Sequence, residues 1–145
     1  MSRQKITAVI PIRKGSQRVP GKNFKEFYNG KNLLELKIES LKQIPLIDEI
    51  IVNTDSKEAI RIAKANNVSW FERNDYYASS KCTNTDHWHN IAETTNSDLI
   101  MHVPCTAPFI KSKTYYDLIN RFILSSHDSA NTVSLVKEYL WLDNK

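Results

Sequence analysis

Residues 6–23 read Ile-Thr-Ala-Val-Ile-Pro-Ile-Arg-Lys-Gly-Ser-Gln-Arg-Val-Pro-Gly-Lys-Asn, and the interpretation of the whole chain starts from them. The first part, residues 6–12, is apolar and β-branched, which is typical of a strand buried on both faces. The chain then enters a loop that carries four basic side chains and two glycines. Backbone N–H groups and cationic side chains in such a loop can hold an anion together. The stretch therefore predicts a phosphate-binding loop.

Two common phosphate-binding loops do not fit the spacing. A Walker A loop has four residues between its first glycine and its Gly-Lys-Ser/Thr end, whereas five residues separate Gly15 from Gly21. Asn23 lacks the hydroxyl that would hold magnesium in that loop. A GxGxxG dinucleotide fingerprint is absent as well, because residue 17 is a glutamine. A less common nucleotide loop and a basic surface loop without a ligand both stay open.

Further apolar runs of strand length follow, and helical patterns separate them. Strands are expected over residues 47–53, 68–71, 99–103 and 131–137. Helices are expected over about 33–43 with Asn32 as cap, after Thr54-Asp55-Ser56, from Thr83 or Thr85 to about 95, and over about 112–124. Residues 24–30, with an Asn29-Gly30 turn, and residues 72–84 are expected to be loops. The alternation predicts an α/β fold with a mostly parallel sheet and helices on both faces.

Several polar segments come directly after predicted strands. They are Arg13, Asp55, Arg73 and residues 104–108, and parallel strands would bring them to one rim of the sheet. Simpler interpretations stay open for each. Arg73 could pair with a neighbouring carboxylate at the surface, and Asn23 could close a turn. Asp55 could cap a helix or bind a metal.

Composition indicates an ordinary globular protein of one domain. The chain has 145 residues, of which 41% are hydrophobic and 25% charged. No apolar run approaches about 20 residues, so no membrane span is expected. The start shows no signal-peptide pattern, and the cytoplasm is the expected location. The net charge is +4, and much of the positive excess lies in the first loop, which favours a local anionic ligand over a nucleic acid.

The two cysteines are isolated in the sequence. Cys82 and Cys105 form no CxxC pair, so neither a disulfide framework nor a zinc site is expected. His87 and His89 lie two residues apart and would not share a helix face, which argues against a two-histidine zinc site. We expect both thiols to be reduced.

Residues 10–23 resemble the amino-terminal signature of the CMP-sugar synthetases, the cytidylyltransferases that activate sialic acid, related nonulosonic acids or KDO. Residues 50–55, 71–73 and 106–108 follow in the order of that family. The resemblance implies a three-layer α/β/α, Rossmann-like nucleotidyltransferase fold. It also implies transfer of CMP from CTP to an acidic sugar, with release of pyrophosphate, for cell-surface polysaccharide biosynthesis.

The resemblance also assigns residues to roles. Arg13 and Lys22 match the family's phosphate-contacting arginine and lysine and are the expected catalytic residues. Arg73 matches an arginine near the cytosine, and Asn23 matches a base-contacting asparagine. The expected nucleotide-binding set is Arg13, Gly15, Ser16, Arg18, Lys22, Asn23, Arg73, Thr83, Asn84 and Thr106.

The chain also departs from the family's pattern. Gln17 stands where the family usually has lysine, and Pro104 stands where many members have a glutamine that helps to hold the base. The family continues into a dimerisation arm and a segment with paired aspartates that bind Mg²⁺. Neither has a counterpart here, so the metal ligands stay unassigned. Residues 1–145 are therefore expected to be a single nucleotide-binding domain and the amino-terminal portion of a longer family chain.

The expected partners are CTP and an acidic sugar, with no nucleic acid and no membrane, and a homodimer is possible. Two other functions stay open. One is a non-catalytic nucleotide-binding or assembly domain that lacks the metal site. The other is a nucleotidylyltransferase for another base, because the residues on the cytosine side match the family least well.

Overall fold

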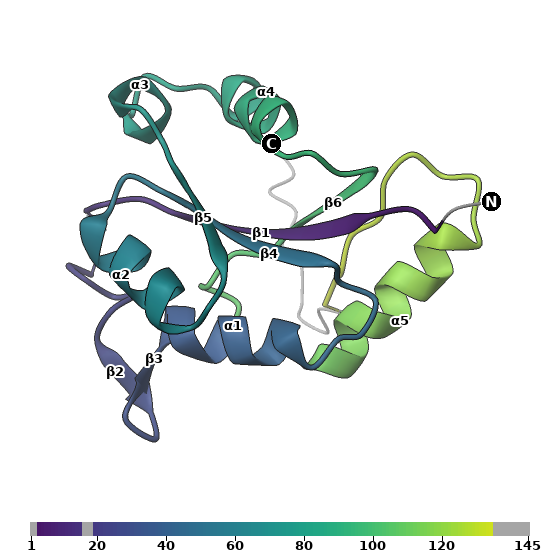
Figure 1. Cartoon of the computed structure of the whole chain (residues 1–145), viewed down its shortest axis with the longest axis horizontal. Coiled ribbons are helices and arrows are strands. Elements are labelled where there is room, and N and C mark those ends of the chain that lie inside the picture. The colour runs from purple at the N-terminus through teal and green to yellow at the C-terminus, as the bar shows by residue number, and fades with distance from the viewer. Residues whose placement is uncertain (1–2, 16–18, 135–145) are drawn as a thin grey trace, which may run out of the picture.

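The computed structural model describes residues 3–15 and 19–134 (Figure 1). Its main sheet has the strand order β5-β4-β1-β6, and all three neighbouring pairs are parallel. The strands are β1 (Ile6–Ile12), β4 (Glu49–Thr54), β5 (Ser69–Glu72) and β6 (Leu99–His102). The predicted α/β class is confirmed.

Strand β1 lies inside the sheet and pairs on both sides. Residues 7–12 are in register with β4, and residues 6–9 are in register with β6. Six of its seven residues are buried. This explains why the sequence of β1 is a continuous apolar run without the alternation of a half-exposed strand.

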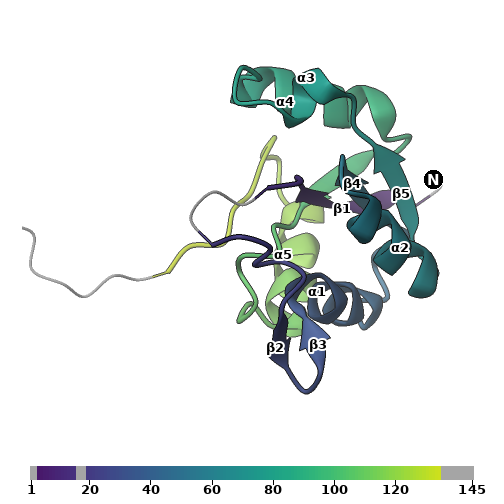
Figure 2. The same ribbon diagram turned by 90° about the vertical axis from the view of Figure 1, so that its left-hand side faces the viewer.

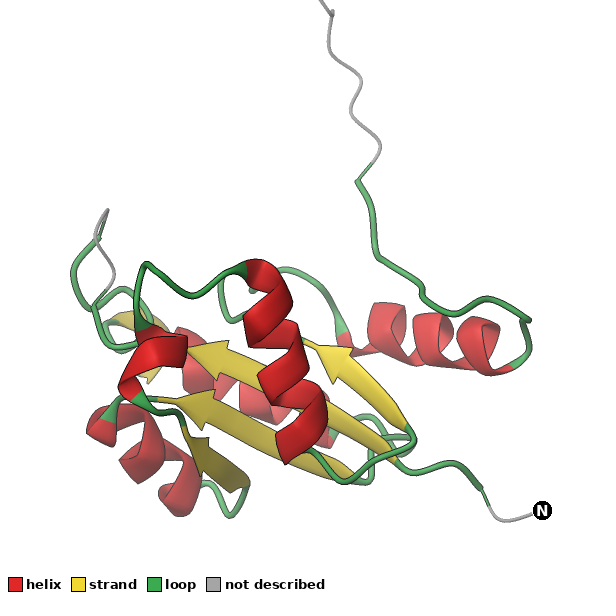
Figure 3. Ribbon diagram, turned by 90° about the horizontal axis from the view of Figure 1, so that it is seen from above, coloured by secondary structure: helices red, strands yellow, loops and turns green. Residues whose placement is uncertain are grey.

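Helices cover both faces of the sheet, which gives the predicted three layers (Figures 1 and 2). One face carries α1 (Leu33–Lys42), α2 (Lys57–Ala65) and α5 (Ser112–Ile123). The opposite face carries α4 (Asn84–Thr94), which lies across the strands when the molecule is seen from above (Figure 3), and the short α3 (Asp75–Ala78). Within the described residues, no helix is both long and apolar enough to cross a bilayer.

The main hydrophobic core lies between the sheet and the layer of α1, α2 and α5. It is built from alternate residues of β1 and β4 and from the inward faces of the three helices. Its members include Ile6, Ala8, Ile10, Ile12, Leu34, Ile38, Leu41, Ile50, Val52, Ile62, Ala63, Tyr115 and Ile119. The leucine, isoleucine and valine side chains among them stabilise the fold by about 1.5–3 kcal/mol each when fully buried.

Three short elements were missed by the sequence analysis. Residues 24–30, expected to be a loop, contain β2 (Glu26–Tyr28), which pairs with β3 (Lys31–Asn32). The Asn29-Gly30 turn is confirmed, because both residues have positive φ, 50° and 73°. Residues 72–84 contain α3, whose cap is Asn74. Elements of two to four residues are too short to show a hydrophobic period.

The helix starts were predicted with mixed success. Asn32 and Thr83 each cap a helix through a reciprocal capping box, as expected. Asp55 was expected as a possible cap of α2, but Ser56 is the cap. The expected strand over residues 131–137 is wrong for residues 131–134, which form no strand, and its last three residues lie outside the described part.

Candidate nucleotide site

The carboxyl ends of the four parallel strands form one rim of the sheet. From β1 the chain moves first to β4 and β5 on one side and later returns to β6 on the other. Ligands of doubly wound sheets bind beyond such a reversal of strand order. In this chain the reversal lies between β1 and β6, where residues 13–25 and 103–111 leave the sheet.

Arg73 is a buried cation on this rim, with 7% of its surface exposed. Its Nη2 donates hydrogen bonds to the carbonyl oxygens of Ile12 and Asn53, the latter at 3.0 Å. Its Nη1 donates to the carbonyl oxygen of Tyr77 at 3.4 Å. The guanidinium therefore spans the ends of β1 and β4. The alternative interpretation of Arg73 as a surface salt-bridge partner is wrong.

The surroundings of Arg73 leave its charge incompletely compensated. Burial lowers the pKa of Arg73, and the nearby positive charge of Arg13 lowers it further. Asp55 and Cys82 have the opposite effect on that pKa. Its Nε is buried and has no hydrogen-bond partner among the described residues. A guanidinium stays protonated in proteins, and a buried charge held mainly by neutral groups is costly. An anion at this rim would relieve that cost.

The basic loop after β1 is anchored to the end of β4. The backbone N–H of Lys14 donates to Asp55 Oδ1 at 2.6 Å. Gly15 follows with φ of +85°, a conformation that favours glycine. Arg13 itself is exposed. The expected convergence of the segments after β1, β4 and β5 is thus confirmed by direct contacts.

Lys22 and Asn23 lie in a turn that is closed by backbone hydrogen bonds. The N–H of Lys22 donates to the carbonyl oxygen of Val19 at 3.2 Å, and that of Phe24 donates to Gly21 at 2.9 Å. Both side chains are half-buried. Asn23 Oδ1 is buried and makes no hydrogen bond within the described residues. The side-chain oxygen of Asn23 is therefore not what closes the turn.

The other predicted residues lie on two further segments. Thr83 Oγ1 accepts a hydrogen bond from the N–H of Asp86 at 3.1 Å, so the Thr83 hydroxyl caps α4. Asn84, the first residue of α4, and Thr106, in the loop after β6, are both exposed. Ser16 and Arg18 lie outside the described residues. Both cysteines are free, as expected.

Three polar residues at or near the rim were missed. Asn53 and Tyr77 offer Arg73 their backbone carbonyls, which no side-chain pattern reveals. Lys37 donates to the carbonyl oxygen of Ala107 in the loop after β6. A signal for Lys37 was present, because it falls on the same helix face as Leu34 and Leu41.

The described residues show no preformed cluster of metal ligands. They contain no group of three or more histidine, cysteine, aspartate or glutamate side chains that could hold a metal ion. Asp55, the candidate named from the sequence, already accepts the short hydrogen bond from Lys14.

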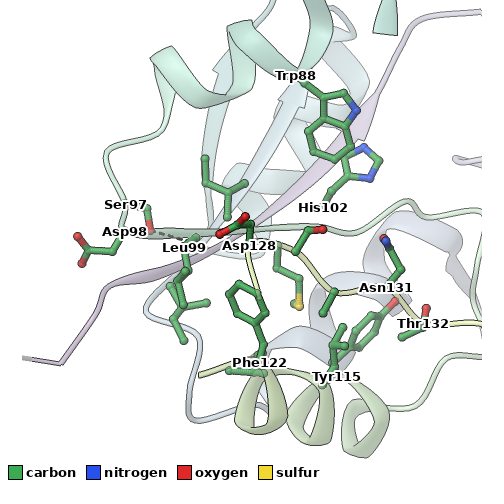
Figure 4. Close-up of a pocket in the computed structure, with 17 residues that line it drawn as sticks. Trp88, Ser97, Asp98, Leu99, His102, Tyr115, Phe122, Asp128, Asn131 and Thr132 are labelled. Carbon is green, nitrogen blue, oxygen red and sulfur yellow. Dashed lines mark hydrogen bonds between the residues drawn. The ribbon is translucent and has the colours of Figure 1, made fainter. Parts of the chain in front are cut away.

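A cavity of about 570 Å³ opens along β6, away from the basic loop (Figure 4). Trp88 and His102 lie against each other on one side of it, and Tyr115 and Phe122 of α5 lie on the other. Among the described residues that line it, Asp98 and Asp128 carry a charge and none is a lysine or an arginine. Two carboxylates without a cation disfavour a triphosphate or an acidic sugar, so the rim is the better candidate.

The comparisons with known proteins identify the family of the chain. The family described as Cytidylyltransferase matches residues 7–139. The chain belongs to the cytidylyltransferase family.

Curated relatives of this cytidylyltransferase chain are named for acidic sugars. It is 31% identical over 109 residues to the 3-deoxy-manno-octulosonate cytidylyltransferase of Koribacter versatilis, covering 74% of this chain and 39% of the relative. It is 32% identical over 127 residues to the pseudaminic acid cytidylyltransferase of Campylobacter jejuni, covering 82% of this chain and 53% of the relative. The chain thus spans about half or less of these relatives' lengths.

Solved structures show the same fold. A cytidylyltransferase from Leptospira borgpetersenii superposes with a TM-score of 0.70 at 26% identity, over 86% of this chain and 51% of that one. A CMP:2-keto-3-deoxy-manno-octonic acid synthetase complexed with CTP also has a TM-score of 0.70, at 24% identity, over 82% of this chain and 47% of that one. These neighbours confirm the predicted nucleotidyltransferase fold.

Proposed function

We propose that this chain is the nucleotide-binding part of a cytidylyltransferase that transfers CMP from CTP to an acidic sugar. The observation that carries the proposal is the buried, incompletely compensated guanidinium of Arg73 beside Arg13 on the rim. The family membership and the two relatives named for acidic sugars support the base and the class of acceptor.

In this reaction a hydroxyl oxygen of the sugar attacks the α-phosphorus of CTP. The bond from that phosphorus to the bridging oxygen of the β-phosphate breaks, pyrophosphate leaves, and the hydroxyl proton passes to solvent. The protein has to align the two reactants and stabilise the charge on the phosphoryl oxygens. We assign that charge stabilisation to Arg13 and Lys22, and one such contact is commonly worth about 3 kcal/mol in the transition state.

The remaining assignments follow the resemblance. Arg73 and Asn23 are proposed to lie against the nucleoside, and Gly15, Ser16 and Arg18 against the triphosphate. Thr83, Asn84 and Thr106 complete the proposed nucleotide contacts. Magnesium, the cytoplasmic location, a homodimer and a role in cell-surface polysaccharide synthesis remain predictions. So does the organisation of residues 1–145 as one domain of a longer chain.

Nucleotide binding can be tested by thermal shift with CTP, UTP, GTP and ATP. A ligand at 100 times its dissociation constant stabilises the folded state by about 2.7 kcal/mol, and we expect CTP to give the largest shift. Lys22→Ala should abolish the shift, whereas Lys25→Ala, at an exposed position in the same segment, should retain it. No shift with any nucleotide, or an unchanged shift in Lys22→Ala, would contradict the proposal.

Catalysis is tested separately by pyrophosphate release with CTP, Mg²⁺ and a panel of sugar acids. Release that is lost in Lys22→Ala supports the enzyme. CTP binding without release supports the alternative of a nucleotide-binding domain that is not catalytic by itself. A larger shift with another nucleotide supports a nucleotidylyltransferase for a different base, for which Pro104 is the first position to examine.

A further inference from the structure

Lys37 is a lysine inside the apolar layer of the protein. It lies in the middle of α1, and only 2% of its surface is exposed. Its Nζ donates hydrogen bonds to the carbonyl oxygen of Ala107 at 2.8 Å and to Tyr115 Oη at 3.0 Å. It therefore joins α1 to two segments that are distant from it in sequence, the loop after β6 and α5.

The partners of this amine are neutral oxygens. No carboxylate lies within 4.0 Å of Lys37 Nζ in the described part of the chain. Burial lowers the pKa of Lys37, and burial raises the pKa of both Cys105 and Tyr115 to about 12, so neither is an anion at neutral pH. An apolar side chain of similar volume would fill this space at lower cost. What it could not supply is the hydrogen bond to Ala107.

The loop after β6 is anchored by the buried side chain of Cys105, but it has few other hydrogen bonds. The last sheet-like bond is donated by the N–H of Val103 to the carbonyl oxygen of Val9 at 2.9 Å. Within the loop, the N–H of Ala107 makes a long bond of 3.4 Å to the carbonyl oxygen of Pro104. Among the described residues, Lys37 is the one side chain that hydrogen-bonds the backbone of residues 104–108. The acceptor, Ala107, directly follows Thr106.

We propose that Lys37 is a positioning residue that fixes the loop of residues 104–107 and thereby orients Thr106 in the nucleotide site. Tyr115 orients the amine by accepting its second hydrogen bond. The restraint on the loop is independent of the ligand. The effect on the nucleotide rests on the proposed function.

The restraint is tested by amide hydrogen exchange of the whole chain. Lys37→Met keeps the length of the side chain and removes the amine, and we expect exchange in residues 104–110 to become at least tenfold faster. Tyr115→Phe should give a smaller acceleration in the same residues, and it serves as the second variant if Lys37→Met folds poorly. Exchange in α2 should not change in either variant. Unchanged exchange in the loop of both variants would overturn the proposal.

The effect on the nucleotide is tested by calorimetric titration of CTP. We expect Lys37→Met to weaken CTP binding about tenfold in the wild-type background and by less than twofold in a Thr106→Ala background. Ile38→Val, a buried change in the same helix, should leave CTP affinity unchanged and controls for destabilisation. If the losses of CTP affinity caused by Lys37→Met and by Thr106→Ala add fully in the double variant, the proposed route through Thr106 is overturned. If the wild-type chain does not bind CTP, the proposed function fails, and the exchange experiment still decides the restraint.

Discussion

The two faces of the central sheet differ in what they bury. The face under α1, α2 and α5 buries a continuous set of apolar side chains. On the face under α4, Ile91 is the fully buried apolar side chain that the helix contributes. The same face holds the buried oxygens Thr7 Oγ1, Asn53 Oδ1 and Asn90 Oδ1, which have no hydrogen-bond partner among the described residues. By strand alternation, Thr7 and Asn53 point away from the main core.

This difference indicates that the stability of the fold and the binding of a ligand depend on different layers of the molecule. Because one layer supplies most of the apolar burial, the other layer can accept polar groups that cost free energy. Arg73 lies at the rim close enough to His87 of α4 for its charge to affect that histidine. We infer that α1, α2 and α5 hold the fold and that the rim and the α4 layer are free to carry the ligand contacts.

The largest expected effect is the loss of a core side chain on the apolar face. Leu34→Ala should lower the free energy of unfolding by about 3–5 kcal/mol, because Leu34 is fully buried among apolar neighbours. Ile91→Ala should cost about 2 kcal/mol, at the low end for such changes, because α4 can shift over its polar contacts. Urea unfolding measures both. A larger loss for Ile91→Ala would reverse the comparison.

The two capping boxes provide a matched pair of smaller changes. Asn32→Ala and Thr83→Ala each remove a cap worth about 1 kcal/mol, the first from α1 and the second from α4. The first should lower the global free energy of unfolding. The second should appear mainly as an approximately fivefold faster amide exchange within α4. Equal global losses would show that α4 unfolds together with the main core.

A change at Thr7 tests the cost of the polar face. Thr7→Val should raise the free energy of unfolding by about 0.5–1 kcal/mol, since it removes a buried hydroxyl without a partner. Thr54→Val is the matched control. Thr54 Oγ1 accepts a hydrogen bond from the N–H of Ser56 at 3.0 Å, so this change should destabilise by about 1 kcal/mol. Destabilisation by Thr7→Val would mean that the hydroxyl of Thr7 has a hydrogen-bond partner in the folded protein.

The smallest expected effect is on pH dependence. Burial lowers the pKa of His102, and the charge of His87 lowers it further. Burial also lowers the pKa of His87, and the charge of Arg73 adds to that effect. The unfolded chain therefore binds more protons than the folded one between the lowered pKa and the ordinary value near 6.5. The contribution of the two neutral histidines to the free energy of unfolding should be fully present above that value. The free energy of unfolding should fall as the pH decreases through this range. The fall should be shallower in His102→Gln, measured by urea unfolding at several pH values.

The sequence predicted the parts of the fold that local patterns determine. The bounds of β1 and the capping role of Asn32 depend on neighbouring residues and were predicted correctly. The burial of Arg73 was not predictable, because its partners are carbonyl groups that only the packing of β1, β4 and α3 brings together. Lys37 could have been noticed as the polar member of an apolar helix face, but its partner in the loop after β6 could not.

Amide hydrogen exchange of the whole chain with and without CTP tests the central claim most directly. Binding at the rim predicts slower exchange with CTP in residues 12–25, 72–77 and 103–107, and unchanged exchange in α1, α2 and α5. Arg73→Met should remove the protection. Protection confined to the cavity along β6, or no protection with CTP at a concentration that shifts the melting temperature, would contradict the account.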